Sequence, residues 1–231
     1  MKKMTVFFLV LLLCVGCDGK AERIIVKQYE VKSELEGVDD IMTPKVVTEI
    51  ATQIVKGKVL SLVKTELNPL GVFTFSYRVR VEEILFDAED RLNDGEKIEV
   101  ISSKGLLPVS DAVGLFESKG LTHDLPLTGN KKNDYVLQTQ GNSIPLEAGG
   151  TYYLYLRAEG KNGYRECGWD LLYRLKGDQA ISGTAEGERT EPASDAEKRI
   201  RELIASREGL DDGFYLSDLI GAYKKEHEED R

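Results

Sequence analysis

Apolar and polar residues alternate over one long stretch near the middle of this chain. Between residues 73 and 82, every second residue is apolar or aromatic: Phe73, Phe75, Tyr77, Val79 and Val81. The residues between them are polar. A period of two over this length indicates a strand with one buried and one solvated face, as in an antiparallel sheet.

Shorter apolar runs, separated by turn residues, predict further strands. Turn clusters stand at Asn68-Pro69-Leu70-Gly71, Asn93-Asp94-Gly95, Gly149-Gly150 and Gly177-Asp178. The predicted strands between and around them are 23–26, 54–63, 97–101, 135–139, 151–156, 171–175 and 179–181. The stretch from Ser102 to Asp134 has no strong period, and we expect it to be a long loop of the kind that is often functional.

Two stretches carry helix signals. Thr43 followed by Pro44 predicts a short helix, with the hydroxyl as N-cap and proline at the first helical position. Ser194-Asp195-Ala196-Glu197 matches a capping box and predicts a helix that Gly209 ends. A weaker helix is expected from Ser217.

The first seventeen residues have the three parts of an export signal. Lys2 and Lys3 form the positive start, an apolar run follows, and Gly16 is a small residue directly before Cys17. The apolar run of about a dozen residues is shorter than the ~20 that a membrane-spanning helix needs. This end resembles the lipobox of bacterial lipoproteins, although Cys14 stands where that motif usually has leucine.

The lipobox resemblance implies cleavage between Gly16 and Cys17 and fatty acyl chains such as palmitate on Cys17. Burial of acyl chains contributes roughly 0.8 kcal/mol per methylene, so two or three chains anchor a protein firmly. We therefore expect a signal peptide at 1–16, a lipid anchor and tether at 17–43, and a protein that faces the extracytoplasmic side of the cell envelope. The alternative is a plain secretory signal with a coincidental cysteine.

Charge narrows the range of partners. The formal net charge of the chain is −9, and removal of residues 1–16 takes away Lys2 and Lys3 and no acid, which leaves −11. A nucleic-acid binder needs a basic surface, so no nucleic-acid partner is expected. Because no polybasic patch is present for anionic lipid, membrane attachment must come from the anchor.

Few residues of the types that carry chemistry are present. With Cys17 lipidated, Cys167 is a lone thiol, and we expect it to be a small, partly buried residue. His123 and His227 do not stand at metal-ligand spacing, and we expect both to occupy ordinary exposed positions. Acidic runs stand at 87–90 and near the C-terminus, and we expect solvated charge at both. The stretch from Asp87 to Gly95 fits a calcium loop only loosely. No catalytic residue, metal or cofactor is predicted.

Aromatic side chains gather in the last part of the predicted sheet. Alternation puts Tyr153 and Tyr155 on one face of their strand and Leu154 on the other. If Leu154 faces the core, both tyrosines point outward beside Arg157, and together with Trp169 they form a candidate surface for a sugar or a peptide. The alternative is that the tyrosines pack under the C-terminal helix.

The order of the strand motifs carries a second resemblance. The motifs are Ile54–Val59, Phe75–Leu85, Gly95–Val100 and Gly149–Leu156. This order resembles a widespread group of bacterial lipoproteins and secreted proteins of unknown function, and the netrin-like, metalloproteinase-inhibitor type of OB barrel. The resemblance implies a mainly β protein, with a five- to six-stranded antiparallel OB-like barrel at 44–185. The helix signal at Ser194 and the charged C-terminal residues indicate a charged helical tail at 186–231. The cysteines that staple netrin-like domains are absent.

The absence of nucleophile–base pairs favours a membrane-anchored, non-enzymatic binding or structural module with a protein or glycan partner. The alternatives are an envelope hydrolase with a carboxylate-based site and a netrin-like inhibitor of a secreted enzyme. A cleft holding two carboxylates, or a buried charged pair, would favour the hydrolase. A filled barrel without a pocket would favour the module.

Overall fold

The structure is a computed structural model, and it describes residues 23–30, 43–125, 133–139, 144–159, 163–167, 173–184 and 187–207. Within these ranges the protein is mainly β, with two sheets and three helices. The expected signal peptide, Cys17, Trp169, His227 and the helix from Ser217 lie outside the described residues.

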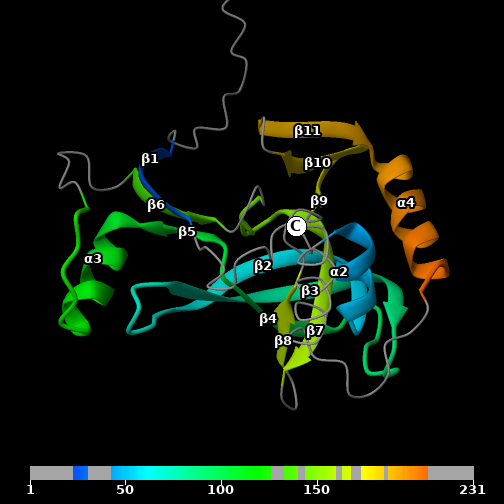
Figure 1. Cartoon of the computed structure of the whole chain (residues 1–231), viewed down its shortest axis with the longest axis horizontal. Helices are drawn as coiled ribbons and strands as arrows, with labels where there is room; N and C mark the ends of the chain where they lie inside the picture. The colour runs from blue at the N-terminus through cyan, green and yellow to red at the C-terminus, as the bar shows by residue number, and fades with distance from the viewer. Residues whose placement is uncertain are drawn as a thin grey trace, which may run out of the picture.

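The larger sheet has eight strands in the order β11-β10-β9-β7-β2-β3-β4-β8 (Figure 1). Their bounds are β2 Gln53–Leu67, β3 Phe73–Asp87, β4 Lys97–Ser102, β7 Thr151–Glu159, β8 Gly163–Glu166, β9 Tyr173–Lys176, β10 Gln179–Thr184 and β11 Gly187–Pro192. β8 pairs in parallel with β4 and also antiparallel with β7. Each of the five strands β2, β3, β4, β8 and β7 is therefore paired with two others of that set.

The centre of this sheet is the long hairpin of β2 and β3. The alternation expected at 73–82 is confirmed, because the five apolar side chains at its odd-numbered positions are all buried. The turn between the strands is held by Asn68, whose side-chain oxygen accepts hydrogen bonds from the N–H groups of Leu70 and Val72, both at 2.9 Å. Gly71 takes a φ of +80° there, which glycine adopts without strain.

The smaller sheet has the order β1-β6-β5, with bounds β1 Ile24–Glu30, β6 Asp134–Thr139 and β5 Gly105–Pro108. β1 runs parallel to β6. The strand expected near residues 23–26 is confirmed, so residues 24–30 of the expected tether belong to the folded part.

The long loop expected from Ser102 to Asp134 is wrong over its first half. β5 lies there, and α3 (Val109–Ser118) follows it directly. α3 buries Val109, Ala112 and Phe116, which share one face of the helix. The sequence did not predict this helix because its N-cap is Pro108, which has no side chain that could accept a capping hydrogen bond.

The two other helices lie together at the right of Figure 1. α2 (Pro44–Ile50) has the expected cap, since the Thr43 side chain accepts from the Val46 N–H at 3.4 Å. α4 (Ala193–Ala205) begins after Pro192 and has no side-chain cap, so the expected capping box is wrong. The region expected to be a tail also holds β11, which pairs with β10.

Two apolar clusters share β7 between them. One joins β2, β3, β4 and β7 with β5, β6 and α3 and includes Leu154 and Leu156. The other lies between the opposite face of β7 and the helices α2 and α4, and it includes Tyr153, Tyr155 and Ile200. Because both faces of β7 are covered, the strand is fully buried over residues 152–156.

Candidate binding groove

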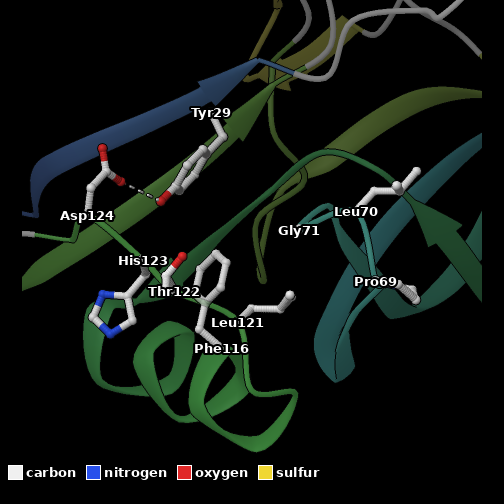
Figure 2. A pocket seen from close by; sticks show the side chains of 9 residues that line it. All are labelled: Tyr29, Pro69, Leu70, Gly71, Phe116, Leu121, Thr122, His123 and Asp124. Carbon is white, nitrogen blue, oxygen red and sulfur yellow. Dashed lines mark hydrogen bonds between the residues drawn. The ribbon is translucent and has the colours of Figure 1, made fainter.

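A groove of about 540 Å³ lies where three distant segments meet: the end of β1, the β2–β3 turn and the segment after α3 (Figure 2). It is lined by Tyr29, Pro69, Leu70, Gly71, Phe116, Leu121, Thr122, His123 and Asp124. The groove is therefore built by a part of the chain that the sequence predicted as a loop, together with the strand nearest the expected anchor.

The floor of the groove is aromatic. The Phe116 ring packs edge-on against Phe73 at 5.5 Å between centroids and tilts against Tyr29 at 6.5 Å. Tyr29 in turn meets Phe73 edge-on at 6.3 Å. Aromatic pairs in such edge-on arrangements are stabilising beyond the area that they bury, so the three rings support one another in the floor.

One wall is the β2–β3 turn, where Leu70 is 76% exposed. Figure 2 shows Leu70 and Pro69 on this turn, across from Phe116 of the floor and Leu121 of the opposite wall. The Asn68 hydrogen bonds described above hold the turn in this conformation, and Leu70 is an exposed apolar side chain on this wall of the groove.

The rim of the groove is polar. The Asp124 carboxylate accepts a hydrogen bond from Lys27 and another from the Tyr29 hydroxyl at 3.3 Å. The hydrogen bond from Lys27 holds the pKa of Asp124 below its usual value. Burial, with the nearby Asp124 charge, raises the pKa of Tyr29 to about 12. Asp124 is thus an ionised rim residue whose oxygens already have partners.

His123 sits between the floor and the rim, with its ring 5.7 Å from that of Phe116. Its Nδ1 atom is buried and has no hydrogen-bond partner among the described residues. The exposed position expected for this histidine is therefore only partly right. Its ring packs beside Phe116, and the buried Nδ1 is not presented to a ligand.

The expected aromatic surface on β7 is wrong. Tyr153 and Tyr155 are each 1% exposed, because α4 and α2 cover the face that the sequence left open. The Tyr153 hydroxyl donates to Glu197 of α4 at 2.9 Å. The alternative, in which the tyrosines pack under the C-terminal helix, is confirmed. Arg157 is exposed near the end of β7, but the two tyrosines do not accompany it at the surface.

A buried charged pair, which the sequence did not reveal, joins Lys104 to Glu166. Their side chains are 0% and 2% exposed, and Nζ lies 2.7 Å from Oε2. The Ser102 hydroxyl donates to the same oxygen at 3.4 Å. The two residues are 62 positions apart in the sequence, and no local motif marks either of them.

Cys167 follows this pair and is partly buried, as expected. Its thiol donates to the Tyr155 carbonyl oxygen at 3.3 Å. Burial raises its pKa to about 12, and the neighbouring Glu166 charge adds to this effect. The thiol is thus protonated near neutral pH, whereas a catalytic cysteine needs a low pKa.

Asp87, in the acidic run, organises its own loop. Its carboxylate accepts hydrogen bonds from the N–H groups of Glu89, Arg91 and Leu92 and from the Gln53 side chain. Burial opposes ionisation of Asp87, but these bonds outweigh it and hold its pKa below the usual value. Its oxygens point to backbone groups rather than to a calcium position.

In the part of the chain that the structure describes, no group of three or more His, Cys, Asp or Glu side chains is arranged to hold a metal ion. None of the described helices is long and apolar enough to cross a bilayer. No protein-family model matches the chain, and no curated protein is detectably similar to it.

Proposed function

We propose that the chain is a lipoprotein of a bacterial cell envelope, anchored through Cys17, whose OB-like barrel binds a protein partner without catalysing a reaction. The groove between β1, the β2–β3 turn and α3 is the proposed binding site. The observation that carries the proposal is this groove, with its aromatic floor and its exposed leucine.

The pairing of the large sheet supports a closed barrel. Following hydrogen-bonded neighbours from β7 through β2, β3, β4 and β8 leads back to β7. The side chains of the first apolar cluster occupy the space between these strands. A ring of five mostly antiparallel strands with a filled interior is the architecture of OB barrels, which is what the order of the sequence motifs implied.

The position of β1 supports a barrel held close to the membrane. β1 begins at Ile24, seven positions after Cys17. A fully extended chain spans at most about 3.6 Å per residue, so this stretch reaches no further than about 25 Å. β1 carries Tyr29 into the groove at its other end, so the anchor and the proposed site are linked by one strand.

The chemistry of the groove favours a protein segment over a glycan. Its floor and the turn wall are apolar, which suits the apolar core of a protein interface, and its charged groups are on the rim. A glycan needs several free hydrogen-bonding groups, but the Asp124 carboxylate is already bound by Lys27 and Tyr29. An apolar side chain of the partner against Phe116 and Leu121 fits better.

The buried ion pair of Lys104 and Glu166 is the kind of feature that would favour the hydrolase alternative, but it does not form an accessible site. Glu166 is 2% exposed and held by Lys104, so a substrate cannot reach it, and the residues that line the groove include one carboxylate, Asp124. An inhibitor of a secreted enzyme is a special case of protein binding at the same groove. The identity of the bound partner distinguishes it.

Metabolic labelling tests the anchor. Cells fed a palmitate analogue incorporate it into the wild-type protein, and a Cys17→Ala variant takes up none and stays at precursor size. A Cys167→Ala variant is the matched control and labels normally. A Cys17→Ala protein that matures and fractionates like wild type excludes the lipoprotein.

Photo-cross-linking in cells tests the groove. A benzoylphenylalanine placed at Leu70 forms an adduct with the partner, and one placed at the exposed Asp94, in the β3–β4 turn, does not. The adduct at position 70 is lost when Leu121 is replaced by Asp, because a charge on the apolar wall repels the ligand. Equal adducts at both positions, or none at position 70, contradict the proposed site.

A further inference from the structure

The outer half of β2 has a free edge. β7 pairs with β2 only over Gln53–Lys58, and the last bonds on that side join Val59 to Gly149 and Gly150. From residue 60 to residue 67, no strand other than β3 pairs with β2 in the described part of the chain. Such an edge presents unpaired N–H and C=O groups to an incoming strand.

This edge is apolar and lies beside a hollow. Leu62 and Val63 are 38% and 46% exposed. A hollow of about 380 Å³ separates the edge from α3, and it is lined by the four consecutive residues 62–65. Consecutive strand residues point to opposite faces. Because residues from both faces line the hollow, it lies along the edge of the strand and not over one face. Gly114 of α3 leaves it open, since a Cβ there would meet no atom within 4 Å.

The charge pattern of this edge is self-complementary when two copies pair antiparallel. Lys64 and Glu66 flank Thr65 on one face of the strand, with Nζ 2.6 Å from Oε1. When two such edges run antiparallel with Thr65 at the centre, Lys64 of each copy lies opposite Glu66 of the other. Opposite charges facing each other across strands stabilise the pair, and like charges destabilise it.

We propose that a second copy of this chain docks on this edge, so that two β2 strands pair antiparallel about Thr65 in a two-fold dimer. The β2–β3 ladder is irregular on both sides of Leu62, which limits the regular edge to the stretch from Lys64 to Leu67. Association in solution is therefore weak. Anchoring both copies to one membrane raises their effective concentration, and this last step alone rests on the proposed function.

Cysteine cross-linking of the full chain in membranes tests the pairing. Antiparallel partners lie 4.5–5.5 Å apart between Cα atoms, roughly the span of a disulfide. A Thr65→Cys variant places its cysteine on the axis and forms a disulfide dimer under mild oxidation. A Leu62→Cys variant places its two copies about 20 Å apart. We expect at least tenfold more dimer from Thr65→Cys than from Leu62→Cys or wild type.

Charge reversal gives the specific readout. In the Thr65→Cys background, Lys64→Glu or Glu66→Lys alone lowers dimer formation by roughly fivefold to tenfold. Co-expression of the two variants restores it, because an acidic edge then faces a basic one. Equal yields in all combinations overturn the proposal, as does a disulfide adduct with a different protein in place of the dimer.

A non-lipidated chain separates the pairing from the anchor. Thr65→Cys with Cys17→Ser is oxidised at high protein concentration in solution. A dimer here without any in membranes supports the pairing and contradicts the step by which the anchor promotes it. Dimer yields at the level of Leu62→Cys in both settings overturn the pairing.

Discussion

Lys104 and Glu166 are the clearest case of a residue-scale effect on stability. Both side chains are removed from water, and each is the ionic partner of the other. Removing one partner of a buried pair leaves a desolvated charge, which costs about 3–5 kcal/mol, whereas replacing both by apolar residues is often neutral.

We therefore expect Lys104→Met to lower the free energy of unfolding by about 3–5 kcal/mol in urea titrations. The double variant Lys104→Met, Glu166→Leu recovers most of this loss. Lys97→Met, on the exposed face of β4, is the control and changes stability by less than about 0.5 kcal/mol. A single variant as stable as its control means that the pair is solvated.

Asp87 gives a pH dependence at the same scale. Because its folded pKa lies below the usual value near 3.9, the ionised carboxylate stabilises the fold above that pH. This stabilisation is lost as the pH falls through the folded pKa. We expect Asp87→Asn to cost about 1 kcal/mol at pH 7, and the difference from wild type to vanish in acid unfolding near pH 2. Asp94→Asn, in the next turn, shows no such pH dependence.

Side-chain alternation predicted single residues well where one face of a strand is solvated. It was right for β3, whose odd-numbered apolar positions are buried and whose polar residues Arg78, Arg80 and Glu82 are exposed, although Ser76 is buried as well. It was wrong for Tyr153 and Tyr155 of β7. A period of two says that two faces differ, but not whether something covers the second one. The cover is α4, some forty residues further along the chain.

At the scale of elements, α4 belongs to the core. Ile200 is 1% exposed and packs with Tyr153 and Tyr155. Truncating a buried isoleucine to alanine costs about 2–5 kcal/mol through lost burial and the cavity left behind. We expect Ile200→Ala to lower the urea midpoint accordingly, and Lys198→Ala, 76% exposed in its side chain, to leave it unchanged. Equal urea midpoints for the two variants would mean that α4 does not contribute to the core.

Elements with strong local signals were predictable, and those defined by their neighbours were not. The hairpin of β2 and β3 has a turn cluster and alternation, and α2 has its cap. α3 has a proline N-cap and an interior glycine, and β11 exposes most of its residues at a sheet edge. Pairing with β10 is what makes β11 a strand, and a single segment does not reveal its partner.

The candidate groove depends on the whole molecule. Its walls come from β1, the β2–β3 turn and the end of α3, which are separated by about forty residues each. The sequence singled out His123 for its chemistry but not for its position, because parallel pairing of β1 with β6 brings the segments together. Export and lipid attachment, by contrast, are local signals and could be proposed from the first seventeen residues.

The reactivity of the Cys167 thiol depends on the fold of the whole molecule. The residue contacts the apolar cluster beneath α4 and follows directly after Glu166 of the buried ion pair. Burial raises its pKa to about 12, so the folded protein holds almost no thiolate at pH 8, and a thiol reagent reacts with it mainly after the chain opens. In a Cys14→Ser, Cys17→Ser chain, where Cys167 is the single thiol, we expect labelling by a thiol reagent to be far slower in the folded protein than in the same chain unfolded in urea.

The labelling rate separates local from global opening. If reaction needs the sheet to open, the rate follows the global unfolding equilibrium as urea is added, and Ile200→Ala accelerates it in proportion to its loss of stability. If fraying of β8 suffices, the rate is independent of both. The first outcome is expected, because β8 is paired on two sides and the thiol is bonded to β7.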